Sequence, residues 1–261
     1  MKKLGIYILS LYLLISCEEV TEWDQETEFV PRLVVEGFIT NNPELNYVKL
    51  SLPITQQGQK PLPVSDARVF VSDGENYLRL IEDDDSGIYY PEDDVRAVVN
   101  KIYYLLIEIG EYNFTAGAAM LPVGPQGEFS YIQVDEQEDL YKINPENGSD
   151  PSMTRYIVEW EEEDRPGRSV FYHYRLNTAD VNEFFKPASE TLVFPGNARI
   201  IRQKYSLSPD HQNYIRGMLS ETEWKGGWFD VLPGNLNTNI SRGGAGFFAA
   251  SSVLTDTVYF E

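Results

Sequence analysis

Short runs of alternating apolar and polar residues follow one another from residue 32 to residue 116. Turn-forming segments such as Asn41-Asn42-Pro43 and Ser72-Asp73-Gly74 separate these runs, which are rich in β-branched and aromatic residues. The pattern predicts strands at 33–40, 47–52, 67–71, 77–80, 87–90, 102–109 and 112–116. About seven short strands in about 85 residues are typical of an immunoglobulin-like (Ig-like) β-sandwich. We therefore predict an Ig-like domain over residues 32–116, without the cysteine and tryptophan core markers of antibody domains.

Residues 117–261 alternate less regularly but still favour strands. Strands are expected at 129–134, 155–160, 169–176, 198–201 and 257–260, with a polar hairpin turn at 161–167. A helix is predicted near 209–222, because Ser208 can cap it and Pro209 suits its first position. Its apolar residues recur at helical spacing: Tyr214, Ile215, Met218 and Leu219. The whole chain is thus expected to be mainly β, with a second domain over residues 117–261 that carries one helix.

The first sixteen residues have the order of a bacterial signal peptide. Lys2 and Lys3 precede an apolar stretch that is shorter than the ~20 residues a membrane-spanning helix needs. The stretch ends in Leu14-Ile15-Ser16-Cys17, which matches the lipobox of bacterial lipoproteins. We expect cleavage before Cys17, diacylglycerol on its thiol and an acyl chain on its amine. An ordinary signal peptide with a chance cysteine is the alternative.

Charge constrains the partners of the mature chain. Removal of residues 1–16 takes away Lys2 and Lys3 but no acidic residue, so the mature chain has 41 acidic and 19 basic residues. Such a surface repels nucleic acid and anionic headgroups, so no nucleic-acid partner is expected. Residues 17–31 are expected to form a flexible acidic tether. An acidic run after the lipidated cysteine resembles the signal for the outer face of the outer membrane in Bacteroidota, so the cell surface is favoured. A solvated linker on the periplasmic face is the alternative.

Residues that commonly carry catalysis are few. Cys17 is the only cysteine, and the two histidines, His173 and His211, lack a Gly-x-Ser-x-Gly segment beside them. We expect His211 to be an exposed residue in the first turn of the helix. The acidic runs 83–85 and 161–163 lack calcium-loop spacing and are expected to be solvated turns, with a bound calcium ion as the alternative. We therefore expect a non-enzymatic protein with no catalytic residues, cofactor or metal; a glycosidase-type carboxylate pair is the alternative.

Aromatic residues gather around the glycine-rich segment 243–246 near the C-terminus. Two interpretations are open: most of these side chains are core, or they form a contact surface for a partner or a glycan. The candidates for such a surface are Trp224, Trp228, Phe229, Asn235, Phe247 and Phe248.

Several segments, taken in order along the chain, carry a family resemblance. They include Cys17-Glu18-Glu19, 33–40, 48–51, 63–69, 72–74, 87–89, and 233–241 followed by 246–253. Together they resemble the domain of unknown function 4249, a family of Bacteroidota lipoproteins, although Ser241-Arg242-Gly243-Gly244 departs from its pattern. The resemblance implies an outer-membrane lipoprotein encoded beside a TonB-dependent receptor, and it carries over no catalytic residue.

The resemblance and the anchor predict a non-enzymatic accessory or binding partner of a TonB-dependent receptor, acting in nutrient capture or uptake. Two alternatives come from other classes of protein. The first is a free surface glycan-binding module or adhesin, and the second is a structural subunit of an envelope assembly complex.

Overall fold

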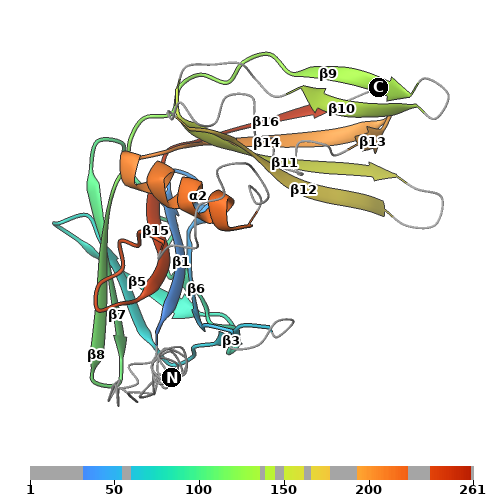
Figure 1. Cartoon of the computed structure of the whole chain (residues 1–261). Helices are drawn as coiled ribbons and strands as arrows, with labels where there is room; N and C mark the ends of the chain where they lie inside the picture. Colours follow the sequence, from blue (N-terminus) through green and yellow to red (C-terminus); the bar gives the residue numbers. More distant parts are fainter. Residues whose placement is uncertain are drawn as a thin grey trace, which may run out of the picture. The chain divides into compact units, whose positions relative to one another are not determined.

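The computed structural model describes residues 32–54, 60–135, 139–144, 150–161, 166–176, 193–222 and 236–259. The predicted signal peptide (1–16), the predicted lipid-attachment residue Cys17 and the predicted tether (17–31) lie outside the described residues. The described part is mainly β and contains one α-helix, which confirms the predicted fold class (Figure 1). No helix within it is long and apolar enough to cross a membrane.

The largest sheet has nine strands and contains every strand predicted between residues 33 and 116. Its members are β1 (Val34–Thr40), β2 (Tyr47–Leu52), β3 (Leu62–Pro63), β4 (Arg68–Ser72), β5 (Tyr77–Glu82), β6 (Ile88–Pro91), β7 (Ile102–Ile109), β8 (Tyr112–Ala119) and β15 (Ala245–Ser251). The strand order is β15-β1-β2-β6-β5-β4-β7-β8, with β3 on β2. Only β1 and β15 run parallel; the other neighbours in this sheet are antiparallel. A short 3-10 helix, η1 (Pro43–Leu45), connects β1 to β2.

The two ends of this sheet approach each other, so the sheet is nearly closed. Leu121, just after β8, forms a parallel bridge with Ser251 at the end of β15. Ser241 exchanges hydrogen bonds with Thr115, and the Asn239 amide donates to the Gly117 carbonyl. The predicted Ig-like sandwich is not confirmed, because β6 pairs with both β2 and β5 and joins all these strands in one sheet. The proposed division at residue 117 stays a prediction, although β15 comes from the C-terminal side of it.

Apolar side chains from alternate strand positions fill the inside of the nearly closed sheet. Val35, Leu50, Val69, Ile107 and Phe248 are fully buried there. Because neighbouring residues on a strand point to opposite faces, Val34, Glu36 and Phe38 of β1 lie on the outer face. That outer face contributes to the pocket described below.

Two smaller sheets pack against each other through a separate core. The first consists of β12 (Pro166–Arg175), β11 (Ser152–Glu161), β14 (Ala198–Ser206) and β16 (Val253–Tyr259), in that order. The second consists of β13 (Val193–Pro195), β10 (Leu140–Asn144) and β9 (Ser130–Asp135). Ile143 and Phe194 from the second sheet meet Tyr156, Val158 and Ile200 from the first. The short strands β10 and β13 were not predicted, because their few residues show no clear alternation.

The predicted helix is present as α2 (Pro209–Thr222). Its first turn is capped as expected: the Ser208 hydroxyl accepts from the His211 amide at 3.3 Å, and the Ser208 carbonyl accepts from the Gln212 amide at 2.9 Å. Ile215 and Leu219, one turn apart, are buried against Met153, Tyr205 and Val253. The helix therefore packs on the four-stranded sheet through the predicted apolar face.

The acidic run Asp83–Asp85 forms the exposed turn between β5 and β6, as predicted. Asp84 and Asp85 adopt left-handed conformations, with φ of 49° and 51°, which Asp tolerates better than most residues. The Ser86 amide closes the turn on the Asp83 carbonyl at 3.0 Å.

Strand β14 is longer than predicted because its polar residues are buried with partners. The sequence pattern ends the strand at Ile201, whereas the structure continues it to Ser206. Arg202, Lys204 and Ser206 point to one face and donate to the carbonyls of Gly127, Pro125 and Leu121, at 3.1, 2.6 and 2.7 Å. Arg202 also forms a two-point ion pair with Asp256 of β16. These bonds attach the segment 121–127 to the four-stranded sheet.

Replacing Asp256 with alanine is expected to lower the free energy of unfolding by about 2 kcal/mol, because it leaves the buried Arg202 guanidinium without its carboxylate. Urea denaturation followed by circular dichroism measures this loss. Asp94→Ala, at an exposed loop position, is the matched control and should change stability little. Equal losses in the two variants would show that the ion pair contributes nothing.

Candidate binding pocket

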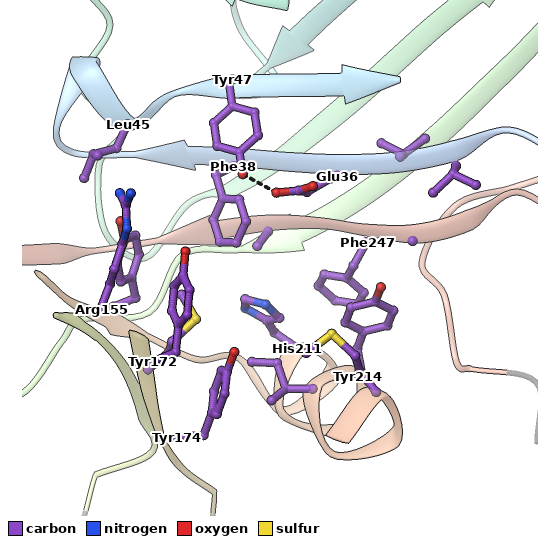
Figure 2. Close-up of a pocket in the computed structure, with 18 of the residues that line it drawn as sticks. Glu36, Phe38, Leu45, Tyr47, Arg155, Tyr172, Tyr174, His211, Tyr214 and Phe247 are labelled. Carbon is purple, nitrogen blue, oxygen red and sulfur yellow. Dashed lines mark hydrogen bonds between the residues drawn. The ribbon is translucent and has the colours of Figure 1, made fainter. Parts of the chain in front are cut away.

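A pocket of about 500 Å³ lies between the outer face of the nearly closed sheet and the elements that cover it. One wall comes from β1, β2 and β15, and the other comes from α2, β11, β12 and β14. Figure 2 shows aromatic side chains converging on it from both walls. Its aromatic lining includes Phe38, Tyr47, Tyr172, Tyr205, Tyr214 and Phe247.

Strand alternation explains why β15 serves both the core and the pocket. Phe248 and Ala250 point inward and are buried in the core of the nearly closed sheet. Phe247 and Ala249 point the other way and line the pocket. Gly37 of β1 lies opposite Phe248, and a β-carbon there would come within 3.0 Å of the Phe248 ring. The missing side chain at Gly37 thus makes room for Phe248 in the core.

The aromatic rings form a connected set. Phe38 lies 5.9 Å from Tyr47, 6.1 Å from Tyr205 and 5.8 Å from His211, measured between ring centroids. Phe247 stacks on both His211 and Tyr214, with centroids 5.0 Å apart in each case. These distances are typical of favourable aromatic contacts, so the pocket wall is held in place by its own members.

His211 was predicted to be exposed, and the structure shows that this is wrong. Its side chain is only 5% exposed, because the first turn of α2 directs it between Phe38 and Phe247. Burial lowers the pKa of the imidazole to about 4, so His211 is neutral at pH 7. Within the described part of the chain, the imidazole has no hydrogen-bond partner. It is therefore a neutral polar group that packs against aromatic side chains of the pocket wall.

The buried imidazole predicts a loss of stability in acid. In the unfolded chain His211 takes up a proton below pH 6.5, whereas in the folded protein it does so only below about pH 4. Stability is thus lost as the pH falls from 6.5 to 4, by about 3 kcal/mol at full extent. His211→Phe should remove this part of the pH dependence and keep the ring contacts.

Denaturant titrations at several pH values between 4 and 7 measure that difference. His173→Gln, which changes the only other histidine, is the comparison variant and should retain the His211 contribution. If His211→Phe loses as much stability in acid as the unmodified protein, then His211 does not cause the loss.

Two groups of opposite charge also line the pocket. The Tyr47 hydroxyl donates to Glu36 Oε1 at 2.5 Å, and burial together with Glu36 raises the pKa of Tyr47, so the phenol stays protonated. Arg155 Nη1 donates to Gln203 Oε1 at 3.3 Å. The Tyr205 hydroxyl donates to the same oxygen at 3.4 Å, and burial raises the pKa of Tyr205 to about 12 despite the nearby Arg155.

Arg155 retains a donor that no described residue uses. Its Nε is buried, yet no hydrogen-bond acceptor from the described residues reaches it. A buried unpaired donor costs free energy, and the cost is higher for a charged group. An acceptor carried by a bound molecule would remove this cost.

The candidates predicted from the sequence fall into three groups. Phe247 lines the pocket and is 7% exposed. Phe248 has no exposed surface and is a core residue, so its prediction as a partner contact is corrected. Trp224, Trp228, Phe229 and Asn235 lie outside the described residues, as does Cys17. Over the described ranges, no three His, Cys, Asp or Glu side chains are grouped as a metal site would require.

Most residues of the pocket were not predicted from the sequence. Glu36, Arg155 and Tyr205 sit on strands whose positions were predicted at least in part, but nothing in their local spacing shows that they face one another. The available signal was weak: tyrosines at alternate positions of one strand, Tyr172 and Tyr174, form a continuous aromatic face.

A comparison with models of known protein families identifies a match over most of the chain. The sequence model of a family described as a domain of unknown function (DUF4249) matches residues 18–257. No curated protein matches the chain.

Proposed function

The chain belongs to the DUF4249 family, and from this premise we propose that it is a non-enzymatic binding lipoprotein of the outer membrane. It captures a nutrient and works as the partner of a TonB-dependent receptor. The observation that carries the proposal is the aromatic pocket with an Arg155 donor that no described residue accepts from. Ligand sites are commonly apolar hollows with a few well-placed polar groups, and a volume of about 500 Å³ is in their usual range.

The chemistry of the pocket supports binding more than catalysis. Rings for stacking, phenolic hydroxyls for hydrogen bonds and two separated charges recognise a molecule without transforming it. His211 has no hydrogen bond to a described side chain that would orient or activate it as a base. A binding function therefore accounts for these groups with the fewest additional assumptions.

The anchor supports a location at the membrane. A lipid on Cys17 and an acidic tether over 17–31 would hold the folded body near the outer membrane while letting it reorient. The acidic run after Cys17 favours the cell surface over the periplasmic face. The receptor partnership rests on the family resemblance, in which these lipoproteins are encoded beside TonB-dependent receptors.

Affinity purification from detergent-solubilised outer membranes tests the partnership. The full-length protein carries a C-terminal tag, and the co-purifying proteins are identified and quantified by mass spectrometry. We expect a TonB-dependent receptor in near-equal amount. A second tagged outer-membrane lipoprotein, purified in parallel, controls for nonspecific recovery.

Other outcomes would support the alternatives. Recovery of the lipoprotein alone, together with affinity for a polysaccharide, would favour a free glycan-binding module or adhesin. Recovery of envelope assembly proteins in place of a receptor would favour a structural subunit. Either result would refute the receptor partnership.

A further inference from the structure

We infer that the pocket binds a small zwitterion, namely an amino acid or a short peptide, with its carboxylate at Arg155 and its ammonium group at Glu36. This inference deepens the proposed function and rests on it. It follows from the placement of the two charged side chains and from what fills the space between them.

Arg155 would bind the carboxylate of the ligand. Nη1 is held by Gln203, while Nε is buried without an acceptor among the residues that the structure describes. Guanidinium groups bind carboxylates with two parallel hydrogen bonds, and these charge-assisted bonds are stronger than neutral ones. Gln203 Oε1 also accepts from the Tyr205 hydroxyl, so the acceptor that orients Arg155 is itself fixed. A carboxylate at Nε would satisfy the unpaired donor and neutralise the charge.

Glu36 would bind the ammonium group of the ligand. Tyr47 donates to its Oε1, which leaves the other carboxylate oxygen without a partner among the described residues. Glu36 also helps to raise the pKa of Tyr47 and of Tyr214, which places its charge beside two phenols of the pocket wall. The side chain is exposed on one side, so an incoming ammonium group can reach it. A second acidic residue, Glu44, lines the same pocket.

The space between the two charges is aromatic. Figure 2 shows Arg155 and Glu36 on opposite sides of Phe38, with Tyr172 reaching up from β12 between Arg155 and His211. Rings in this position can stack on an apolar or aromatic side chain and on a planar peptide group. A neutral sugar would also stack on these rings. It would, however, leave the carboxylate and the guanidinium without opposite charges, so the charge pattern favours a zwitterion.

Isothermal titration calorimetry with the purified full-length lipoprotein in detergent tests this inference. The probe is the dipeptide Leu-Tyr, compared with its N-acetylated form, its C-terminally amidated form and the neutral disaccharide maltose. Blocking either end should weaken binding about 10- to 100-fold, since a hydrogen bond to a charged group contributes about 1.5–3 kcal/mol. Maltose should bind weakly or not at all.

Two variants test which charged side chain binds each end of the ligand. Glu36→Gln should weaken binding of Leu-Tyr but not of the N-acetylated form, and Arg155→Gln should weaken binding of Leu-Tyr but not of the amidated form. The matched controls are Glu92→Gln and Arg79→Gln, at exposed positions outside the pocket. Circular dichroism and thermal melting establish that each variant is folded.

Four results would overturn the inference: blocked and free peptides bind equally, maltose binds more tightly than Leu-Tyr, neither charged-residue variant changes the affinity, or no probe binds. Tight maltose binding would leave a ligand-capture function in place and change the ligand class. If no probe binds while a receptor still co-purifies, the zwitterion inference fails and the receptor partnership stands. The two proposals therefore fail separately.

Discussion

Replacing Gly246 with alanine is expected to unfold the junction between β1 and β15 and to lower the free energy of unfolding by more than about 3 kcal/mol. Gly246 has φ of +86°, a conformation that L-residues rarely adopt. A β-carbon there would also overlap the backbone of its strand partner Val35, at the carbonyl oxygen. Neither strand can move freely, because β15 pairs with β1 on one side and is held on the other by two hydrogen bonds between the Asn239 side chain and the Phe248 backbone.

Gly74→Ala separates the cost of the left-handed backbone conformation from the cost of the steric overlap with Val35. Gly74 has φ of +92°, but a β-carbon there would meet no atom within 4 Å, so only the conformational cost of about 1–2 kcal/mol applies. Urea denaturation of both variants, followed by circular dichroism, provides the comparison. If Gly246→Ala is no less stable than Gly74→Ala, then the close approach of β1 and β15 does not hold in solution.

Replacing Cys17 with alanine is expected to abolish lipidation completely. The predicted lipobox Leu14-Ile15-Ser16-Cys17 contains one thiol, and Cys17 is the only cysteine in the chain. Growth with radiolabelled palmitate, followed by immunoprecipitation, measures the modification. The unmodified protein should carry label and fractionate with the outer membrane, because each buried CH₂ of an acyl chain contributes about 0.8 kcal/mol of membrane affinity.

Ser16→Ala serves as the control for that experiment, because a lipobox tolerates small residues at this position. It should retain label and membrane location. Label on the Cys17→Ala protein would contradict the assignment of Cys17 as the lipid attachment site. The lipid anchor in the proposed function would then be wrong as well.

The alternation of apolar residues was sufficient to predict most long strands. It placed β2 and β7 at their observed ends, because apolar residues at alternate positions of each strand are buried and most of the positions between them are more exposed. The helix was predicted with its true bounds, since a capping serine and proline mark its beginning. β15 was less apparent, because glycines at 243, 244 and 246 make its start look like a loop and its parallel partner β1 is some 200 residues away.

The pocket could not be predicted for a physical reason. Glu36, Arg155 and His211 come from three elements that are distant in sequence, and each local pattern is compatible with an ordinary exposed polar residue. Only the packing of α2 and the four-stranded sheet on the outer face of β1 and β15 brings these side chains together. His211 shows the difficulty: helical position alone predicted exposure, whereas tertiary contacts with Phe38 and Phe247 bury it.

The aromatic pocket is proposed to be the ligand-binding site of this protein. Ala249 lines the pocket from β15, and Ala249→Leu would fill part of it while leaving both charged side chains in place. Native mass spectrometry of the full-length protein, mixed in detergent with Leu-Tyr, measures occupancy directly. We predict a bound dipeptide on the unmodified protein and its loss from the folded Ala249→Leu variant. Equal occupancy of the two proteins, or no bound dipeptide on either, would contradict the account.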